Sequence, residues 1–193
     1  HILDACAYKQ KNPRLKVVVT GGLAERYRQD VAAEIPEVDA VVGIGANNDL
    51  TRILEELVEA DSPRQPVEAY GQKTDLQLGG SRVISTPGHY AWLKIAEGCS
   101  NACSYCDIPQ IRGPLRSRPL ADCVEEARWL AGQGVTVVVL VAQDVTAFGD
   151  DRGENPIVPL LLALDKVEGL HWIRLLYAYP ERITAELLGT MRS

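Results

Sequence analysis

Long apolar runs are missing from this 193-residue sequence. The longest largely apolar stretch, residues 135–142, has only the length of a strand, whereas a membrane-spanning helix needs about 18 apolar residues or more. The first residues show neither the basic start nor the apolar segment of an export signal. We therefore expect a protein without a membrane span. The missing initiator Met also leads us to expect a fragment of a longer chain.

An excess of basic residues is missing as well. The sequence has 20 Lys and Arg against 26 Asp and Glu, which gives a net charge of −6. Because general nucleic-acid binding requires a basic face, a protein or small-molecule substrate is favoured and nucleic acid is not an expected partner. The five cysteines are an odd number, and three of them lie within eight residues. That pattern favours a metal site over disulfides and predicts a cytoplasmic, reducing environment.

The hydrophobic pattern predicts an α/β fold with two regions. Residues 1–60 alternate strands and helices and predict part of a small parallel α/β domain, with strands at 16–20 and 39–45 and helices at 23–35 and 50–60. Residues 61–88 collect Pro and Gly and predict a linker with one short hairpin. Residues 89–193 predict three βα units of a parallel sheet or barrel, with strands at 90–96, 135–142 and 172–179 and helices at 119–133, 159–167 and from 184 onward.

The first of these barrel strands leads directly into the motif Cys99-x3-Cys103-x2-Cys106. Three thiolates in one short loop can hold three corners of a 4Fe-4S cluster and leave the fourth iron without a protein ligand. That iron can chelate the amino and carboxylate groups of S-adenosylmethionine, so that one electron breaks a carbon–sulfur bond and produces a 5′-deoxyadenosyl radical. A structural zinc site is the alternative, and it would need a fourth ligand such as His89. Cys6 and Cys123 are expected to be small core residues.

Several segments around this motif resemble the radical S-adenosylmethionine methylthiotransferases. The resemblance lies closest to the branch that methylthiolates an aspartate β-carbon of small-subunit ribosomal protein twelve, rather than the branch that acts on adenosine in tRNA. The segments that carry it are residues 17–27, 93–113, 116–119, 142–149 and 173–180. It implies a radical-SAM partial βα barrel in the second region, of which about three βα units are present. It also implies a methylthiotransferase with a ribosomal protein as substrate and a flavodoxin or ferredoxin as electron donor.

The same resemblance implies roles for individual residues. Cys99, Cys103 and Cys106 would ligate the radical-generating cluster, and Tyr105 would either pack near the adenine or cover the cluster from solvent. Gln143 and Asp144 follow a barrel strand, where either could contact the methionine or ribose part of the cofactor. A turn-capping Asp144 is the alternative.

Three arginines follow the cysteine loop. Arg112, Arg116 and Arg118 could pair with carboxylates of the cofactor or of an acidic substrate, or they could form a solvated face.

The sequence also departs from the family pattern. Methylthiotransferases of this type carry a second 4Fe-4S cluster on three N-terminal cysteines, but Gly22 occupies one of those positions and the other two are not found here. The chain also ends after the third barrel strand, where the family continues. Two further alternatives therefore stay open: a tRNA methylthiotransferase, and a cluster-binding fragment that cannot insert sulfur.

Overall fold

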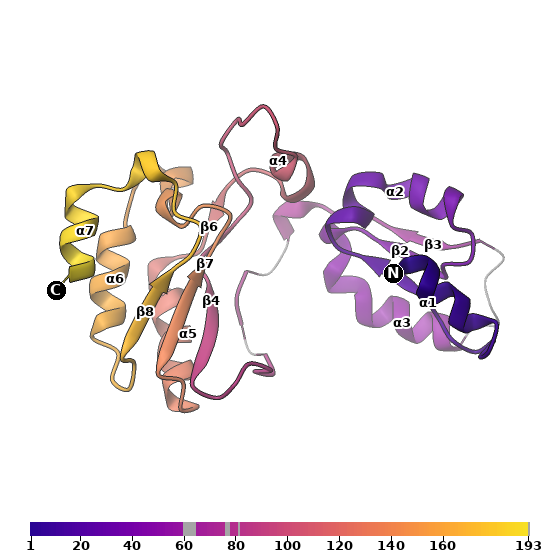
Figure 1. Cartoon of the computed structure of the whole chain (residues 1–193), viewed down its shortest axis with the longest axis horizontal. Helices are drawn as coiled ribbons and strands as arrows, with labels where there is room; N and C mark the ends of the chain where they lie inside the picture. The colour runs from indigo at the N-terminus through magenta and orange to yellow at the C-terminus, as the bar shows by residue number, and fades with distance from the viewer. Residues whose placement is uncertain (60–64, 76–77, 81, 193) are drawn as a thin grey trace. The chain divides into compact units, whose positions relative to one another are not determined.

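The computed structural model describes residues 1–59, 65–75, 78–80 and 82–192. The chain forms two compact units (Figure 1), one of His1–Leu76 with Gln110–Arg112 and one of Gln77–Pro109 with Gly113–Ser193. Each unit contains its own parallel sheet with helices, so the predicted α/β fold is confirmed. Among the described residues, no helix is long and apolar enough to cross a membrane.

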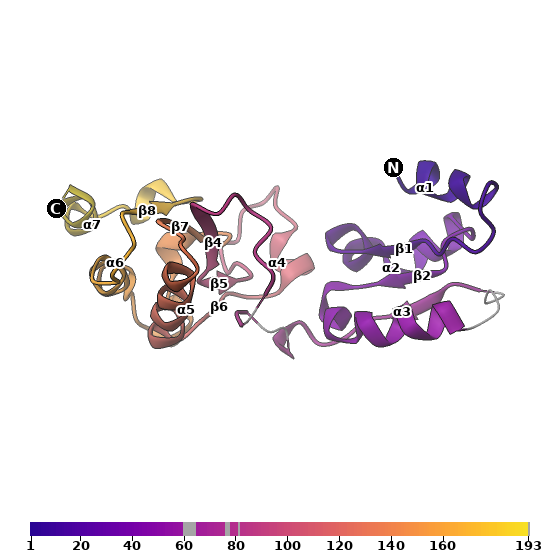
Figure 2. The ribbon, with the colours of Figure 1, turned by 90° about the horizontal axis from the view of Figure 1, so that it is seen from below.

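The first unit is built on a three-stranded parallel sheet in the order β1-β2-β3, with strands β1 (Val18–Thr20), β2 (Ala40–Val42) and β3 (Val67–Ala69). Val19 and Val41 lie in one buried cluster, while Ala40 and Val42 lie in another, as expected when successive side chains point to opposite faces. Helices α1 (Ile2–Lys9) and α2 (Gly22–Glu34) cover the first face, and α3 (Leu50–Glu59) covers the second (Figure 2). Burial on both faces explains why the central strand is wholly apolar.

Strand β3 corrects the prediction for the segment between the two regions. The sequence predicted a linker with a hairpin over residues 61–88, yet β3 pairs in parallel with β2 and completes the first sheet. Val67, Glu68 and Ala69 form no apolar run, and the strand is set by its pairing with β2 rather than by a local turn. Residues 60–64, 76–77 and 81 of that segment lie outside the described residues, and the proposed limits of the domains stay a prediction.

The second unit is built on β4 (Tyr90–Lys94), β7 (Val137–Val141) and β8 (Trp172–Leu175), which are parallel and in the order β4-β7-β8. Helices α5 (Leu120–Gly132) and α6 (Ile157–Asp165) pack against one face of this sheet, and α7 (Ala185–Arg192) packs beside α6 (Figures 1 and 2). The three predicted βα units are therefore present. The last strand is shorter than the predicted 172–179, because Tyr177 has a φ of 64° and leaves the extended conformation.

The register of this sheet separates a face that the helices cover from a face that they do not cover. Leu93 pairs with Leu140 in the same row, and both are fully buried beneath the helices. In the neighbouring row, Trp92 pairs with Val139, which pairs with Arg174, and Trp92 is 45% exposed. The helices thus cover only one face of β4-β7-β8 within the described residues.

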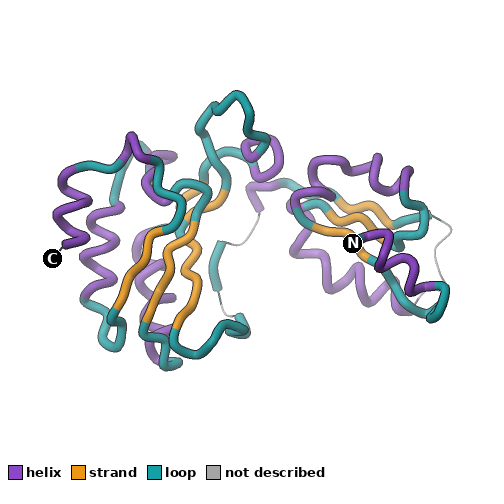
Figure 3. Tube along the Cα trace, viewed as in Figure 1, coloured by secondary structure: helices purple, strands orange, loops and turns teal. Residues whose placement is uncertain are grey.

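Short elements gather beyond the carboxyl ends of these strands (Figure 3). The strands β5 (Ala96–Glu97) and β6 (Arg116–Ser117) form an antiparallel pair, and the cysteine loop and α4 (Ile108–Arg112) lie between them in the chain. The 3-10 helices η3 (Val145–Ala147) and η4 (Asp150–Arg152) follow β7, and η5 (Pro180–Arg182) follows β8. In the first unit, η1 (Ile44–Asp49) follows β2 and η2 (Lys73–Asp75) follows β3.

Candidate cluster and cofactor site

The base of the cysteine loop is held by backbone geometry. Glu97 pairs with Arg116 across the β5–β6 ladder, and Gly98 then turns the chain with a φ of 78°. The next residue, Cys99, donates its N–H to the carbonyl of Gly113 at 3.1 Å. A second link joins the loop to its return strand, since the N–H of Leu115 donates to Ser100 Oγ at 3.1 Å. The first cysteine of the motif is thus fixed at the carboxyl end of the sheet.

The other two cysteines lie on a turn farther along the loop. The N–H of Cys106 donates to the carbonyl of Cys103 at 3.1 Å, which brings their backbones together. All three cysteines are free thiols and are partly exposed. Their sulfur atoms do not converge, and among the described residues no three His, Cys, Asp or Glu side chains form a group that could hold a metal ion. Cys99 is therefore the cysteine whose backbone is anchored to the return segment of the loop.

His89 is excluded as a partner of these thiols. His89 lies before the start of β4, whereas the cysteines lie after its end. A five-residue strand spans about 15 Å, so His89 and the cysteines are at opposite ends of the strand. Its carbonyl accepts hydrogen bonds from the N–H groups of Thr136 and Val137 at the amino-terminal end of the sheet. The zinc alternative that relied on His89 is thus wrong.

Two tyrosines flank Cys103. The side chain of Tyr105 is 87% exposed, and that of Tyr179 is 36% exposed. The charge of Cys103 and a hydrogen bond to it raise the pKa of the Tyr105 hydroxyl. The charge of Cys103, followed by that of Glu181, likewise raises the pKa of Tyr179. Tyr105 was identified from the sequence, whereas Tyr179 was not, because 76 positions separate it from Cys103.

Gln143 and Asp144 leave the carboxyl end of β7 in different environments. Asp144 is 3% exposed, and its Oδ1 accepts hydrogen bonds from both the N–H and the hydroxyl of Thr146, so that it caps η3. The turn-capping alternative for Asp144 is thus confirmed. Gln143 has a buried Oε1 for which the described residues provide no donor. Of the two side chains, Gln143 is the one with an acceptor left for a ligand.

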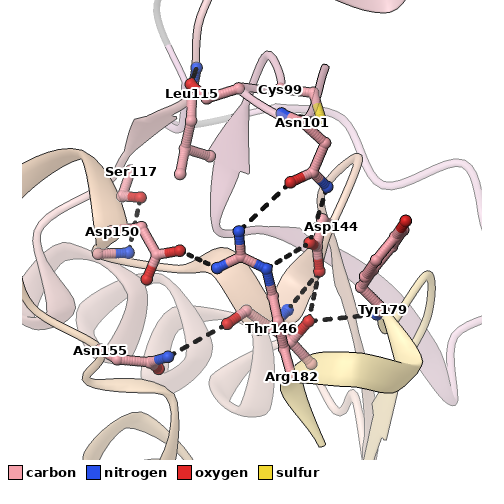
Figure 4. A network of polar contacts seen from close by, with 12 residues as sticks. Cys99, Asn101, Leu115, Ser117, Asp144, Thr146, Asp150, Asn155, Tyr179 and Arg182 are labelled. Atoms are coloured by element: carbon pink, nitrogen blue, oxygen red, sulfur yellow. Dashed lines mark hydrogen bonds and ion pairs between the residues drawn. The ribbon is translucent and has the colours of Figure 1, made fainter. Parts of the chain in front are cut away.

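The second oxygen of Asp144 joins a network that reaches the cysteine loop (Figure 4). Asp144 Oδ2 accepts a hydrogen bond from Asn101 Nδ2 at 3.3 Å and forms an ion pair with Arg182 Nε at 3.5 Å. Arg182 also donates to Asn101 Oδ1 at 3.3 Å and pairs with Asp150. These residues and Cys99 line a cavity of about 90 Å³. Sequence reasoning missed Asn101, Asp150 and Arg182, because only the folded sheet brings them together.

The three arginines after the loop have different surroundings. Arg118 is 6% exposed, forms an ion pair with Glu126 at 2.6 Å and donates to the carbonyl of Lys94 at 2.8 Å. It is therefore a structural residue, so that for Arg118 neither of the two alternatives, a partner of the cofactor or substrate and part of a solvated face, is correct. Arg116 has buried Nε and Nη2 atoms with no acceptor among the described residues. Arg112 is the last residue of α4.

The remaining cysteines are core residues, as predicted. Cys6 is 8% exposed and Cys123 is fully buried. Burial raises the pKa of the Cys123 thiol to about 11. Gly22, which stands where the family resemblance places a cluster ligand, is the first residue of α2.

Comparisons with known proteins give one matching family and several similar proteins. Residues 93–183 match the family model of the Radical SAM superfamily. Over 97% of its length the chain is 45% identical to the ribosomal protein uS12 methylthiotransferase RimO of Acetivibrio thermocellus and covers 42% of that protein. It is 46% identical to the RimO of Syntrophotalea carbinolica, over 97% of this chain and 41% of that protein. It is 44% identical to the RimO of Clostridioides difficile, over 95% of this chain and 41% of that protein.

The chain thus spans about two fifths of the length of these curated relatives. Among solved structures, it is similar to the radical S-adenosylmethionine methyltransferase TsrM from Kitasatospora setae, with a TM-score of 0.63 and 19% sequence identity. That match covers 98% of this chain and 42% of TsrM. At this identity the likeness concerns the fold alone.

Proposed function

We propose that this chain carries the radical-generating site of a methylthiotransferase, from the premise that its residues 93–183 match the Radical SAM superfamily. The reaction would add a methylthio group to the β-carbon of an aspartate in small-subunit ribosomal protein uS12, the substrate that the names of the relatives give for those proteins. The observation that carries the proposal is the placement of three free, partly exposed thiols in one loop at the carboxyl end of a parallel sheet.

The three loop cysteines are suited to hold a 4Fe-4S cluster. Thiolates are the ligands that such clusters require, and here none of them is used in a disulfide. Cys99 is anchored to Gly113, while Cys103 and Cys106 lie on an exposed turn that can bring their sulfurs to the same cluster. Three ligands leave one iron for S-adenosylmethionine, and when bound, the cluster supplies the electron that cleaves it.

Gln143 is the residue that we propose for contact with the cofactor. Among the described residues, Gln143 Oε1 is a buried acceptor without a donor, a cost in free energy that a hydrogen-bond donor on a ligand would remove. S-adenosylmethionine presents amino and hydroxyl donors that could satisfy it. Asp144 would support the site without binding the cofactor, because both of its oxygens already have partners. Tyr105 would cover the cluster from solvent.

The remaining functional assignments follow from the proposed reaction. A flavodoxin or ferredoxin would provide the electron, and a cytoplasmic location would bring the enzyme together with the ribosomal protein. The net charge of −6 favours a ribosomal protein, which is typically basic, over tRNA as substrate. A cluster-binding unit that cannot insert sulfur is the second candidate, favoured by Gly22 at a position where the family has a ligand to its second cluster.

Anaerobic reconstitution with iron and sulfide tests the proposal. The purified chain should hold about one 4Fe-4S cluster, since it has one three-cysteine loop. Cys103→Ala should abolish cluster binding, while Cys123→Ala, which removes a buried thiol outside the loop, should retain it. A chain that takes up zinc and neither iron nor sulfide would refute the proposal.

Product analysis separates the candidate reactions. The reduced, loaded chain is incubated with S-adenosylmethionine and either a uS12 peptide or tRNA. Methylthiolated peptide supports the first proposal, and methylthiolated tRNA refutes the assignment of the substrate. Release of 5′-deoxyadenosine without either product supports the cluster-binding unit.

A further inference from the structure

We propose that Arg182 is a positioning residue for the cysteine loop. Through the side chain of Asn101, it would hold the segment between Cys99 and Cys103 against the carboxyl ends of β7 and β8. That Arg182 orders the loop is inferred from the hydrogen bonds and ion pairs around Arg182 alone. The effect of this ordering on a bound cluster rests on the proposed function.

The guanidinium of Arg182 spreads over three partners (Figure 4). Its Nε lies 3.5 Å from Asp144 Oδ2, one Nη donates to Asn101 Oδ1 at 3.3 Å, and the other pairs with Asp150. A planar fork of donors suits this arrangement, whereas an ammonium group presents its charge at one point. Arg182 thus joins η5 to the segments that follow β7 and to the cysteine loop.

Asn101 is the residue through which the network reaches the loop. Its amide nitrogen donates to Asp144 and its amide oxygen accepts from Arg182, so both ends of the side chain are used. A carboxylate or an apolar side chain at this position could not do both. The backbone N–H of Asn101 in turn donates to Cys99 Sγ at 3.4 Å. A residue held by Arg182 is therefore in direct contact with a sulfur of the motif.

Asp144 gives the network a rigid support. It is 3% exposed, and Thr146 holds its Oδ1 through two hydrogen bonds at the end of β7. The hydroxyl of Thr146 also accepts the N–H of Tyr179 at 3.2 Å, which links the same support to the segment after β8. Hydrogen bonds between charged groups at a buried position are stronger than neutral ones at the surface. The loop is thus tied to a buried carboxylate that the segments after β7 and β8 hold in place.

The experiment compares Arg182→Gln with Arg128→Gln, the same substitution at an exposed arginine of α5. Hydrogen–deuterium exchange is measured on the metal-free chain in the peptide covering residues 99–105. Arg182→Gln should increase exchange there about tenfold, because it removes charged hydrogen bonds. Arg128→Gln should leave it unchanged. Asn101→Leu should reproduce the increase, which keeps the test decisive if Arg182→Gln does not fold.

A second measurement connects the loop to the cluster. After reconstitution, Arg182→Gln should lose iron to a chelator about tenfold faster than the unmodified chain and show an altered EPR spectrum, because hydrogen bonds to the sulfurs tune a cluster. Arg182→Lys should restore these properties only in part. Unchanged exchange over residues 99–105 in a folded Arg182→Gln chain would overturn the inference. A chain that never binds a cluster would refute the proposed function, while the exchange data would still decide the role of Arg182.

Discussion

Gly98, directly before the first cysteine of the motif, should not tolerate a side chain. It adopts a φ of 78°, in the left-handed region that favours glycine. A Cβ built on Gly98 would overlap the carbonyl oxygen of Pro114 and lie 2.6 Å from that of Gly113. The Gly113 carbonyl is the acceptor that holds the N–H of Cys99. Gly98→Ala should therefore both strain the backbone and push apart the two sides of the cysteine loop.

The expected loss of stability has two parts. The left-handed conformation costs a non-glycine residue about 1–2 kcal/mol. Overpacking against a backbone that cannot move aside costs about 1–3 kcal/mol more. Gly98→Ala should thus lower the free energy of unfolding by about 2–5 kcal/mol. Gly153→Ala isolates the first part, because Gly153 has a φ of 69° with no atom within 4 Å of its Cβ position. It should cost only about 1–2 kcal/mol.

Urea unfolding followed by tryptophan fluorescence measures both variants. The three tryptophans, Trp92, Trp129 and Trp172, all belong to the second unit, so the signal reports the unit that contains the loop. Gly132→Ala, at a helical position with open space, is a control that should be neutral or slightly stabilising. Equal losses of stability in Gly98→Ala and Gly153→Ala would show that the contact with Pro114 does not matter and refute the reasoning. Iron binding should fall in Gly98→Ala alone.

Three further outcomes are expected from the buried residues. At pH 8, iodoacetamide should modify the loop cysteines of the metal-free chain and leave Cys123 unmodified, because a pKa of about 11 leaves roughly one Cys123 thiolate in a thousand. Mass spectrometry of the digested chain identifies the modified cysteines. Since the fold favours the neutral Cys123 thiol, its contribution to the free energy of unfolding should decrease as the pH rises from 9 towards 11, and this decrease should be absent in Cys123→Ala. Arg118→Leu should lower the free energy of unfolding in urea by about 3 kcal/mol, because among the described residues it leaves the buried carboxylate of Glu126 with Arg82 as its one ion-pair partner. A loss no larger than that of a surface substitution would contradict the role of this ion pair.

Local pattern was enough to predict most of the secondary structure. The runs of β-branched residues predicted β2 and β7, and the predicted helices 50–60 and 119–133 correspond closely to α3 and α5. These segments are long or strongly apolar, so that their own residues decide their conformation. β3 was missed because Val67–Ala69 contains no apolar run, so that the strand is set by its pairing with β2.

The residues of the candidate site also fall into those that the sequence identified and those that only the structure identified. Spacing alone identified the thiols Cys99, Cys103 and Cys106, because a cluster loop is a local motif whose chemistry resides in adjacent residues. The sequence likewise determined the α/β class and placed Gln143 and Asp144 at the end of a strand.

Only the tertiary structure decided which neighbouring polar groups have partners. In the folded chain, Asp144 interacts with Thr146, Asn101 and Arg182. The Oε1 of Gln143 has no donor among the described residues, and Arg118 is buried against Glu126. These outcomes depend on the parallel sheet, which brings the segments after β7 and β8 to the same edge as the cysteine loop. Asn101 and Arg182 are 81 positions apart in the chain. No local pattern encodes such a contact, because the hydrogen bond exists only after β4, β7 and β8 have paired.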